Sequence, residues 1–144
     1  MEIQDLYQEL IVDHGRSPRN KGRVVEPTHA AEGTNPLCGD EVYLTLRIVD
    51  GVIEEAQFEG CGCAVSTASA SLLTEQVRGK TVEEAKSLFD DLRDCIVYKK
   101  SPENDLGPLE ALVPIREYPM RVKCVTLAWH TLISALKGNH APTH

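Results

Sequence analysis

Two runs of residues that alternate between apolar and more polar side chains flank one Asp-Gly dipeptide near the middle of the chain. The first run is EVYLTLRIV, which ends at Val49, and the second is VIEEAQFEG, which begins at Val52. Asp50 and Gly51 lie between them, and both residue types tolerate the positive φ angles that two-residue hairpin turns require. The pattern therefore predicts an antiparallel β-hairpin, which constrains the fold more than any other feature of this sequence.

Helical patterns lie on both sides of the hairpin. Apolar residues at helical spacing predict a first helix that ends at Gly15, and a run of small residues predicts a helix over 64–78, closed by Gly79. Thr81–Glu84 has the sequence of a capping box and predicts the start of another helix. We also expect a short helix over 106–112, a last helix after Tyr118-Pro119, and a short strand over 24–31 that Pro27 interrupts.

This order of elements predicts an α+β fold in which a small antiparallel sheet of about three strands packs against helices. The chain has 144 residues, which is the length of one domain. We expect residues 1–138 to form that domain and residues 139–144 to form a flexible tail. The formal net charge of −7 argues against nucleic acid as a partner, because binding to phosphates depends on cationic groups. The sequence contains neither a signal peptide nor an apolar stretch of eighteen residues, so we expect a cytoplasmic protein without a membrane segment.

The five cysteines are spread over the chain, which argues for a reducing compartment and against a disulfide scaffold. Three of them share a setting that favours thiolate chemistry. Cys38 lies in the turn-rich segment NPLCGD, Cys63 directly precedes the helix of small residues, and Cys124 stands just before or at the start of the last helix. Unpaired N–H groups at a helix N-terminus favour negative charge, and the thiolate is both the nucleophile and the metal ligand. Arg121 and Lys123 add positive charge beside Cys124.

These three cysteines and Asp40 form a set of donors that a zinc ion accepts in tetrahedral geometry. Spacing alone is a weak signal, because the four residues are scattered along the chain. A cysteine is also often simply a small core residue, and that interpretation is the one we favour for Cys95. The residues leave both interpretations open for Cys124, favour a functional role for Cys38 and Cys63, and leave Cys61 as either a spare thiol or a rim residue.

Three motifs in this order resemble a known family. NPLCGD, FEGCGCAVSTASAS and YPMRVKCVTLAW, together with the opening LYQELIVDHGRSPRNKG, are similar to the U-type iron–sulfur cluster assembly proteins, which comprise IscU, the N-terminal part of NifU, and SufU. The likeness runs from about residue 6 to residue 136. Lys123 stands where IscU proteins have a histidine, and a long segment separates Cys63 from Cys124. Both features resemble the SufU branch.

The resemblance implies a SufE/IscU-like fold and a zinc ion bound by Cys38, Asp40, Cys63 and Cys124. It also implies that a cysteine desulfurase delivers persulfide sulfur to this site, with Arg121 and Lys123 in contact with the partner, and that scaffolds or apo-proteins accept the product. We expect Cys38 to be the sulfur acceptor. Two alternatives stay open: the same four residues hold a nascent [2Fe–2S] cluster, as in a scaffold, or zinc only stabilises a small protein-interaction module.

Overall fold

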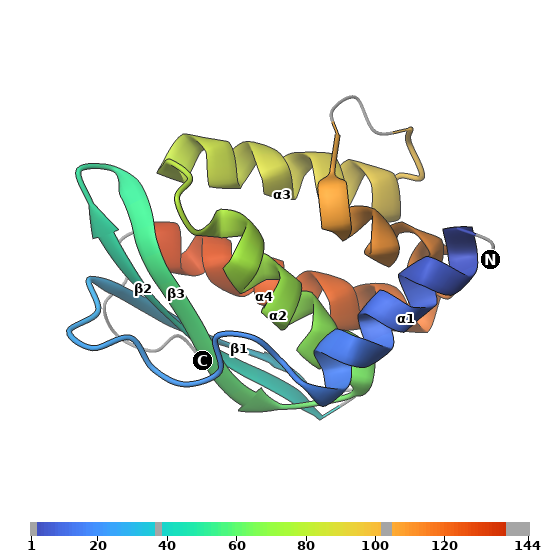
Figure 1. Ribbon diagram of the computed structural model, residues 1–144, viewed down its shortest axis with the longest axis horizontal. Coiled ribbons are helices and arrows are strands. Elements are labelled where there is room, and N and C mark those ends of the chain that lie inside the picture. Colours follow the sequence, from blue (N-terminus) through green and yellow to red (C-terminus); the bar gives the residue numbers. More distant parts are fainter. Residues whose placement is uncertain (1–2, 37–38, 102–104, 138–144) are drawn as a thin grey trace.

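The computed structural model describes residues 3–36, 39–101 and 105–137, and within residues 3–7 it describes the backbone alone. Over these residues an antiparallel sheet with strand order β1-β2-β3 carries α2 and α4 on one face, so the predicted α+β fold is confirmed (Figure 1). The elements are α1 (Ile3–Arg16), β1 (His29–Asn35), β2 (Asp40–Val49), β3 (Val52–Cys61), α2 (Ala64–Val77), α3 (Val82–Ile96), the 3-10 helix η1 (Gly107–Glu117) and α4 (Pro119–Leu136).

The predicted hairpin is confirmed as β2 and β3. Asp50 and Gly51 form the turn, with φ angles of +52° and +77°, which explains why this dipeptide suits the position. Side chains alternate between the two faces of the sheet, so Val42, Leu44 and Leu46 all point to the helical side and are at most 3% exposed. The inward-facing side chains of the hairpin therefore form the side of the core that lies against the helices.

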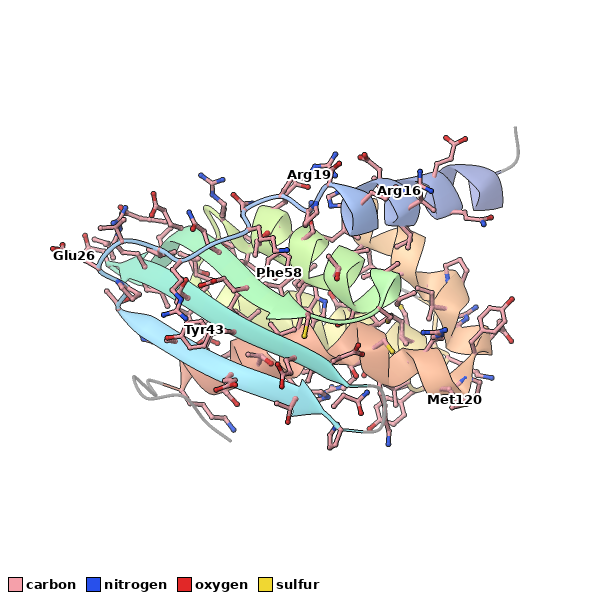
Figure 2. All side chains as sticks on the ribbon, turned by 90° about the horizontal axis from the view of Figure 1, so that it is seen from below. Arg16, Arg19, Glu26, Tyr43, Phe58 and Met120 are labelled. Carbon is pink, nitrogen blue, oxygen red and sulfur yellow. The ribbon has the colours of Figure 1, made fainter. Side chains whose placement is uncertain are left out.

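The strand expected over 24–31 is wrong in its boundaries, because β1 starts at His29 and continues to Asn35. Residues 24–28 instead belong to a loop that runs over the outer face of the sheet, where the Val24 N–H donates to the Thr45 Oγ1 at 2.9 Å. Pro27 has no N–H to give to a strand ladder, and Glu26 has a positive φ of +52°. Figure 2 shows this loop, with Glu26 at one end of the sheet and Tyr43 on the outer face beneath it.

The first helix passes the expected end at Gly15 and continues to Arg16. The absence of a side chain at Gly15 allows two helices to approach closely, because a Cβ atom there would lie 3.1 Å from the carbonyl oxygen of Ala64. Helix α1 can therefore pack directly against the beginning of α2, and Figure 1 shows the two helices side by side.

The predicted helix over 64–78 is confirmed as α2, and the capping box is confirmed at the start of α3, where the Glu84 N–H donates to the Thr81 Oγ1 and the Thr81 N–H donates to the Glu84 carboxylate. The short helix expected over 106–112 is part of the longer η1. Cys95 is 1% exposed in the core, as predicted. No helix in the described ranges is long and apolar enough to cross a membrane. The expected tail, residues 139–144, lies outside the described residues.

Candidate metal centre

Three of the four predicted metal ligands meet at one end of the sheet. Asp40 is the first residue of β2, Cys63 directly precedes α2, and Cys124 lies in α4. Each offers one ligand atom, and these atoms all lie within 4.8 Å of one another. Three elements that are distant in the sequence therefore bring two thiols and a carboxylate to a single point.

Asp40 is held rigidly through one of its carboxylate oxygens only. It is 1% exposed, and its Oδ1 accepts the N–H of Cys63 at 3.0 Å. The second oxygen, Oδ2, is buried and has no hydrogen-bond partner in the described part of the chain. A Cβ atom on Gly62 would lie 2.7 Å from Oδ1, so a larger residue at that position would displace the Asp40 carboxylate. A buried carboxylate oxygen without a partner is costly, and a bound cation removes that cost.

Cys63 occupies the N-cap position of α2, as the sequence predicted. Its backbone is extended, with φ −70° and ψ 167°, and its Sγ accepts the N–H of Ser66 at 3.4 Å. The residue is half-buried. The Cys63 sulfur therefore lies at the N-terminus of α2, beside the N–H groups that have no partner within the helix.

The expectation that Cys124 stands just before or at the start of the last helix is wrong. Helix α4 begins at Pro119, so Cys124 lies in its second turn, fully buried, and gains little from the free N–H groups of the first turn. Burial raises the pKa of the Cys124 thiol strongly, and the neighbouring Cys63 and Asp40 raise it further. The thiol alone therefore keeps its proton at neutral pH. A divalent cation among these three groups would reverse the effect, because it binds the thiolate.

Arg121 and Lys123 differ in their relation to the thiols. The sulfur atoms of Cys124 and Cys63 raise the pKa of the exposed Arg121, which places its guanidinium close to both. Arg121 and Cys124 are three residues apart and so share one face of α4. Lys123 is exposed and lies on a different face of that helix from Cys124. The predicted contact of both residues with a partner stays a prediction.

Cys38 lies outside the described residues, so its predicted roles as ligand and sulfur acceptor stay predictions. The described residues on either side of it form a turn: the Gly39 N–H donates to the Asn35 carbonyl oxygen at 2.8 Å, and Gly39 has a φ of +72°. Asp40 follows directly.

Cys61 lies on the opposite face of the sheet from the three clustered residues. It pairs with Glu41 across β2 and β3, is exposed, and its Sγ is 3.8 Å from the Glu41 Oε2. Alternation along β2 explains this position, because Asp40 points inward and Glu41 therefore points outward. Asn35 was not among the predicted site residues, although it pairs with Asp40 and is 8% exposed. The signal that could have found it is its place at the start of the motif NPLCGD, five residues before Asp40.

The described donor set suits zinc. Two sulfur atoms and one carboxylate oxygen are ligands that zinc takes in tetrahedral sites, and the buried Asp40 Oδ2 has no hydrogen-bond partner in the described part of the chain. The half-buried Cys63 leaves the cluster within reach of solvent on one side. Such an arrangement can bind a metal and still meet a partner.

Known proteins share both the sequence and the fold. The family of NifU-like N terminal domains matches residues 6–125. The zinc-dependent sulfurtransferase SufU of Bacillus subtilis is 40% identical over 131 residues, which cover 90% of this chain and 88% of that protein. The iron–sulfur cluster assembly scaffold protein IscU of Thermotoga maritima is 41% identical over 142 residues, covering 99% of this chain and all (100%) of that protein.

Solved structures of similar proteins have the same fold. The structure named FiSufU, from the thermophile Fervidobacterium islandicum AW-1, superposes with a TM-score of 0.85 at 37% identity and covers 94% of this chain and 99% of its own. The N-terminal part of a nitrogen-fixing NifU-like protein from Brucella abortus superposes with a TM-score of 0.84 at 25% identity, covering 94% of this chain and 95% of its own.

Proposed function

We propose that this chain, which belongs to the family of NifU-like N-terminal domains, accepts persulfide sulfur from a cysteine desulfurase at a zinc centre and supplies it for iron–sulfur cluster assembly. One observation carries the proposal: the buried Asp40 carboxylate keeps an unpartnered oxygen beside the thiols of Cys63 and Cys124. The zinc-dependent relative from Bacillus subtilis supports the choice of metal and of reaction.

Asp40, Cys63 and Cys124 would hold the zinc ion, with Cys38 as the fourth ligand. Zinc bound there keeps its ligand thiols in the thiolate form. The chain supplies the rest of the arrangement. The Cys63 N–H fixes one oxygen of Asp40, and the N-cap position fixes the Cys63 sulfur at the start of α2. The Arg121 guanidinium brings a positive charge to the two sulfurs.

The transfer itself is an attack of a thiolate on a sulfur atom. The acceptor thiolate, which we assign to Cys38, bonds to the terminal sulfur of the partner's persulfide. The sulfur–sulfur bond of the donor breaks, its cysteine leaves as a thiolate, and the acceptor now carries the persulfide, so no external oxidant or reductant is needed. Cys124 is a poor acceptor because it is fully buried. Arg121 would stabilise the negative charge that the incoming persulfide brings.

The partner would contact the exposed beginning of α4. Tyr118 is 65% exposed and Met120 is 82% exposed, next to Arg121 and close to Lys123 (Figure 2 labels Met120). A cavity of about 660 Å³ lies between α1, α2 and η1 and is lined by Val65, two residues after Cys63, and by Tyr118. Aromatic, methionine and arginine side chains are the types that protein interfaces favour.

The test compares Cys38→Ala with Cys63→Ala and Cys124→Ala, with the stimulation of desulfurase turnover as the measurement. We expect Cys38→Ala to abolish stimulation while the fold is kept, because the acceptor is missing. Full stimulation by this variant would remove Cys38 from the role. Zinc content of the freshly purified protein, measured alongside, tests the metal.

A scaffold function is the second candidate, because the IscU scaffold of Thermotoga maritima matches this chain over 99% of its length. The same residues would then hold a [2Fe–2S] cluster, and the Asp40 carboxylate would ease its release. Anaerobic reconstitution with iron and sulfide distinguishes the two functions. A stable visible chromophore favours the scaffold, whereas a zinc protein that resists exchange favours sulfur transfer.

The receiving proteins would be downstream scaffolds or apo-proteins, and the setting would be the cytoplasm, which suits free thiols. If zinc served only to stabilise an interaction module, chelation would unfold the chain. A fold that survives chelation, together with lost desulfurase stimulation, argues against that alternative.

A further inference from the structure

Asn35 is a second buried polar residue at the candidate metal centre. It is the last residue of β1 and lies directly opposite Asp40 in the sheet. Side chains of directly opposed strand residues point to the same face, about 4.5–5.5 Å apart at Cβ. Asn35 is 8% exposed, and its Nδ2 has no hydrogen-bond partner in the described part of the chain.

The hydrogen bond that closes the turn after β1 does not involve the Asn35 side chain. The bond that closes the turn comes from the backbone, where the Asn35 carbonyl oxygen accepts the Gly39 N–H. A buried amide nitrogen without an acceptor opposes folding, since it loses its bonds to water and gains none. The residue is therefore a costly choice for a purely structural position.

Among the described residues, Asn35 and Asp40 leave complementary atoms without a partner. Asn35 leaves a donor, Nδ2, and Asp40 leaves an acceptor, Oδ2, yet the two are not bonded to each other. Each is free for a third group, and the two groups have opposite character: a cation for the carboxylate oxygen, and an electron-rich atom for the amide. A metal ion with thiolate ligands supplies both at once, because its sulfur atoms accept hydrogen bonds.

We propose that Asn35 is a positioning residue of the metal centre, whose amide N–H donates to a thiolate sulfur bound to the same ion as Asp40. This inference rests on the proposed zinc centre and adds a residue to it. Outer partners of this kind orient metal ligands and tune their basicity. A hydrogen bond withdraws electron density from the sulfur and holds it in place, which favours the bound thiolate.

The experiment uses Co²⁺ in place of zinc, in the full chain, because sulfur-to-cobalt charge-transfer absorption reports directly on the thiolates. Three variants are compared with the unchanged protein. Asn35→Ala removes the donor, and Asn35→Asp keeps the volume but replaces the donor with an acceptor. Thr34→Ala is the control, because Thr34 is the neighbouring residue on β1 and is exposed on the outer face.

We expect both Asn35 variants to shift the charge-transfer band to longer wavelength, since a sulfur without the hydrogen bond gives up an electron more easily. Competition with a chelator should show about a 10-fold to 100-fold loss of zinc affinity for Asn35→Ala. The melting temperature of the metal-free Asn35→Ala protein should stay close to that of the unchanged protein. Thr34→Ala should change none of these quantities.

A band at the unchanged wavelength in both variants, or an Asn35→Ala protein that melts several degrees lower without metal and binds zinc normally, would overturn the inference. These outcomes leave the zinc centre itself intact. An unchanged protein that binds neither Co²⁺ nor zinc would refute the proposed centre, and the inference with it. Desulfurase stimulation, measured on the same samples, shows separately whether the proposed function holds.

Discussion

Two buried polar clusters lie along helix α2, one at its start and one in its second half. They differ in how many of their polar atoms have hydrogen-bond partners. In the second half of the helix, the Ser71 Oγ bonds to the His14 Nδ1 at 2.7 Å and accepts the Arg19 N–H at 2.8 Å. The His14 Nε2 faces the Glu75 carboxylate at 3.5 Å. We call these four residues the Ser71 network. At the start of the helix, in the candidate metal centre, one oxygen of Asp40 and the amide nitrogen of Asn35 have no hydrogen-bond partner among the described residues.

This difference separates stability from binding. A bonded buried polar group contributes modestly to folding, whereas an unbonded one opposes it until a ligand arrives. The Ser71 network joins α1 and the following loop to α2, so it stabilises the folded chain. The unbonded atoms of the candidate metal centre would lower the stability of the metal-free chain, and a bound metal would recover that free energy.

The largest effect is expected for Asp40→Asn, measured as zinc affinity by chelator competition. The variant keeps an oxygen for the Cys63 N–H but loses the anionic ligand, so we expect a loss of more than about 100-fold, or about 2.8 kcal/mol. The metal-free protein should be no less stable in urea. The matched control is Glu41→Gln on the outer face. Unchanged zinc affinity in Asp40→Asn would contradict the centre described above.

The reverse pattern is expected for Ser71→Ala. Removal of the hydroxyl leaves the buried His14 Nδ1 and the Arg19 N–H without their partner, so the free energy of unfolding should fall by about 1–3 kcal/mol. Zinc affinity should not change. Urea unfolding of the metal-free protein measures the first quantity, with Thr67→Ala, a half-buried hydroxyl of the same helix, as the control. If Ser71→Ala lowered zinc affinity and left the free energy of unfolding unchanged, the proposed difference between the two clusters would be wrong.

A change of pH is expected to have a smaller effect on the free energy of unfolding. Burial lowers the pKa of His14 from 6.5, and the positive charge of Arg19 lowers it further, while Glu75 and Asp13 oppose the shift. The unfolded chain therefore binds the proton first. The stabilisation from neutral His14 is present above about pH 6.5 and is lost as the pH falls through the folded pKa, by at most about 1.4 kcal/mol per pH unit.

The measurement is urea unfolding of the metal-free protein between pH 7.5 and 5, compared with His14→Gln. We expect the variant to be less stable at pH 7.5 and to depend less steeply on pH, because its side chain does not titrate in this range. Equal slopes in the two proteins would show that His14 does not contribute to the pH dependence.

The smallest effect is expected for Cys61→Ser. Cys61 is exposed on the outer face of the sheet beside Glu41, away from the three clustered residues. Zinc affinity and stability should both stay at the values of the unchanged protein. A 10-fold loss of zinc affinity would place Cys61 among the ligands and contradict the division between the two faces.

Local patterns predicted the elements whose structure depends on neighbouring residues. Asp50-Gly51 predicted the hairpin, Thr81–Glu84 predicted the start of α3, and Tyr118-Pro119 predicted the start of α4. The predicted boundaries were wrong where an element's end is decided by contacts with residues distant in the sequence. Gly15 does not end α1, because it serves contact with α2, and β1 begins five residues later than expected, because its pairing with β2 decides where it starts (His29 against residue 24).

The sequence by itself determined the α+β architecture, the hairpin, and the set of thiols and carboxylate from which a metal site can be built, because residue types and short-range periodicity encode these features. Only the tertiary structure decided which of these residues meet. It separated Cys61 from Cys63 and buried Cys124 within a helix rather than at its start. Within the described residues it also left Asp40 and Asn35 with unpartnered atoms on one face of the sheet. Which atoms lack a partner depends on packing between elements that are distant in the chain.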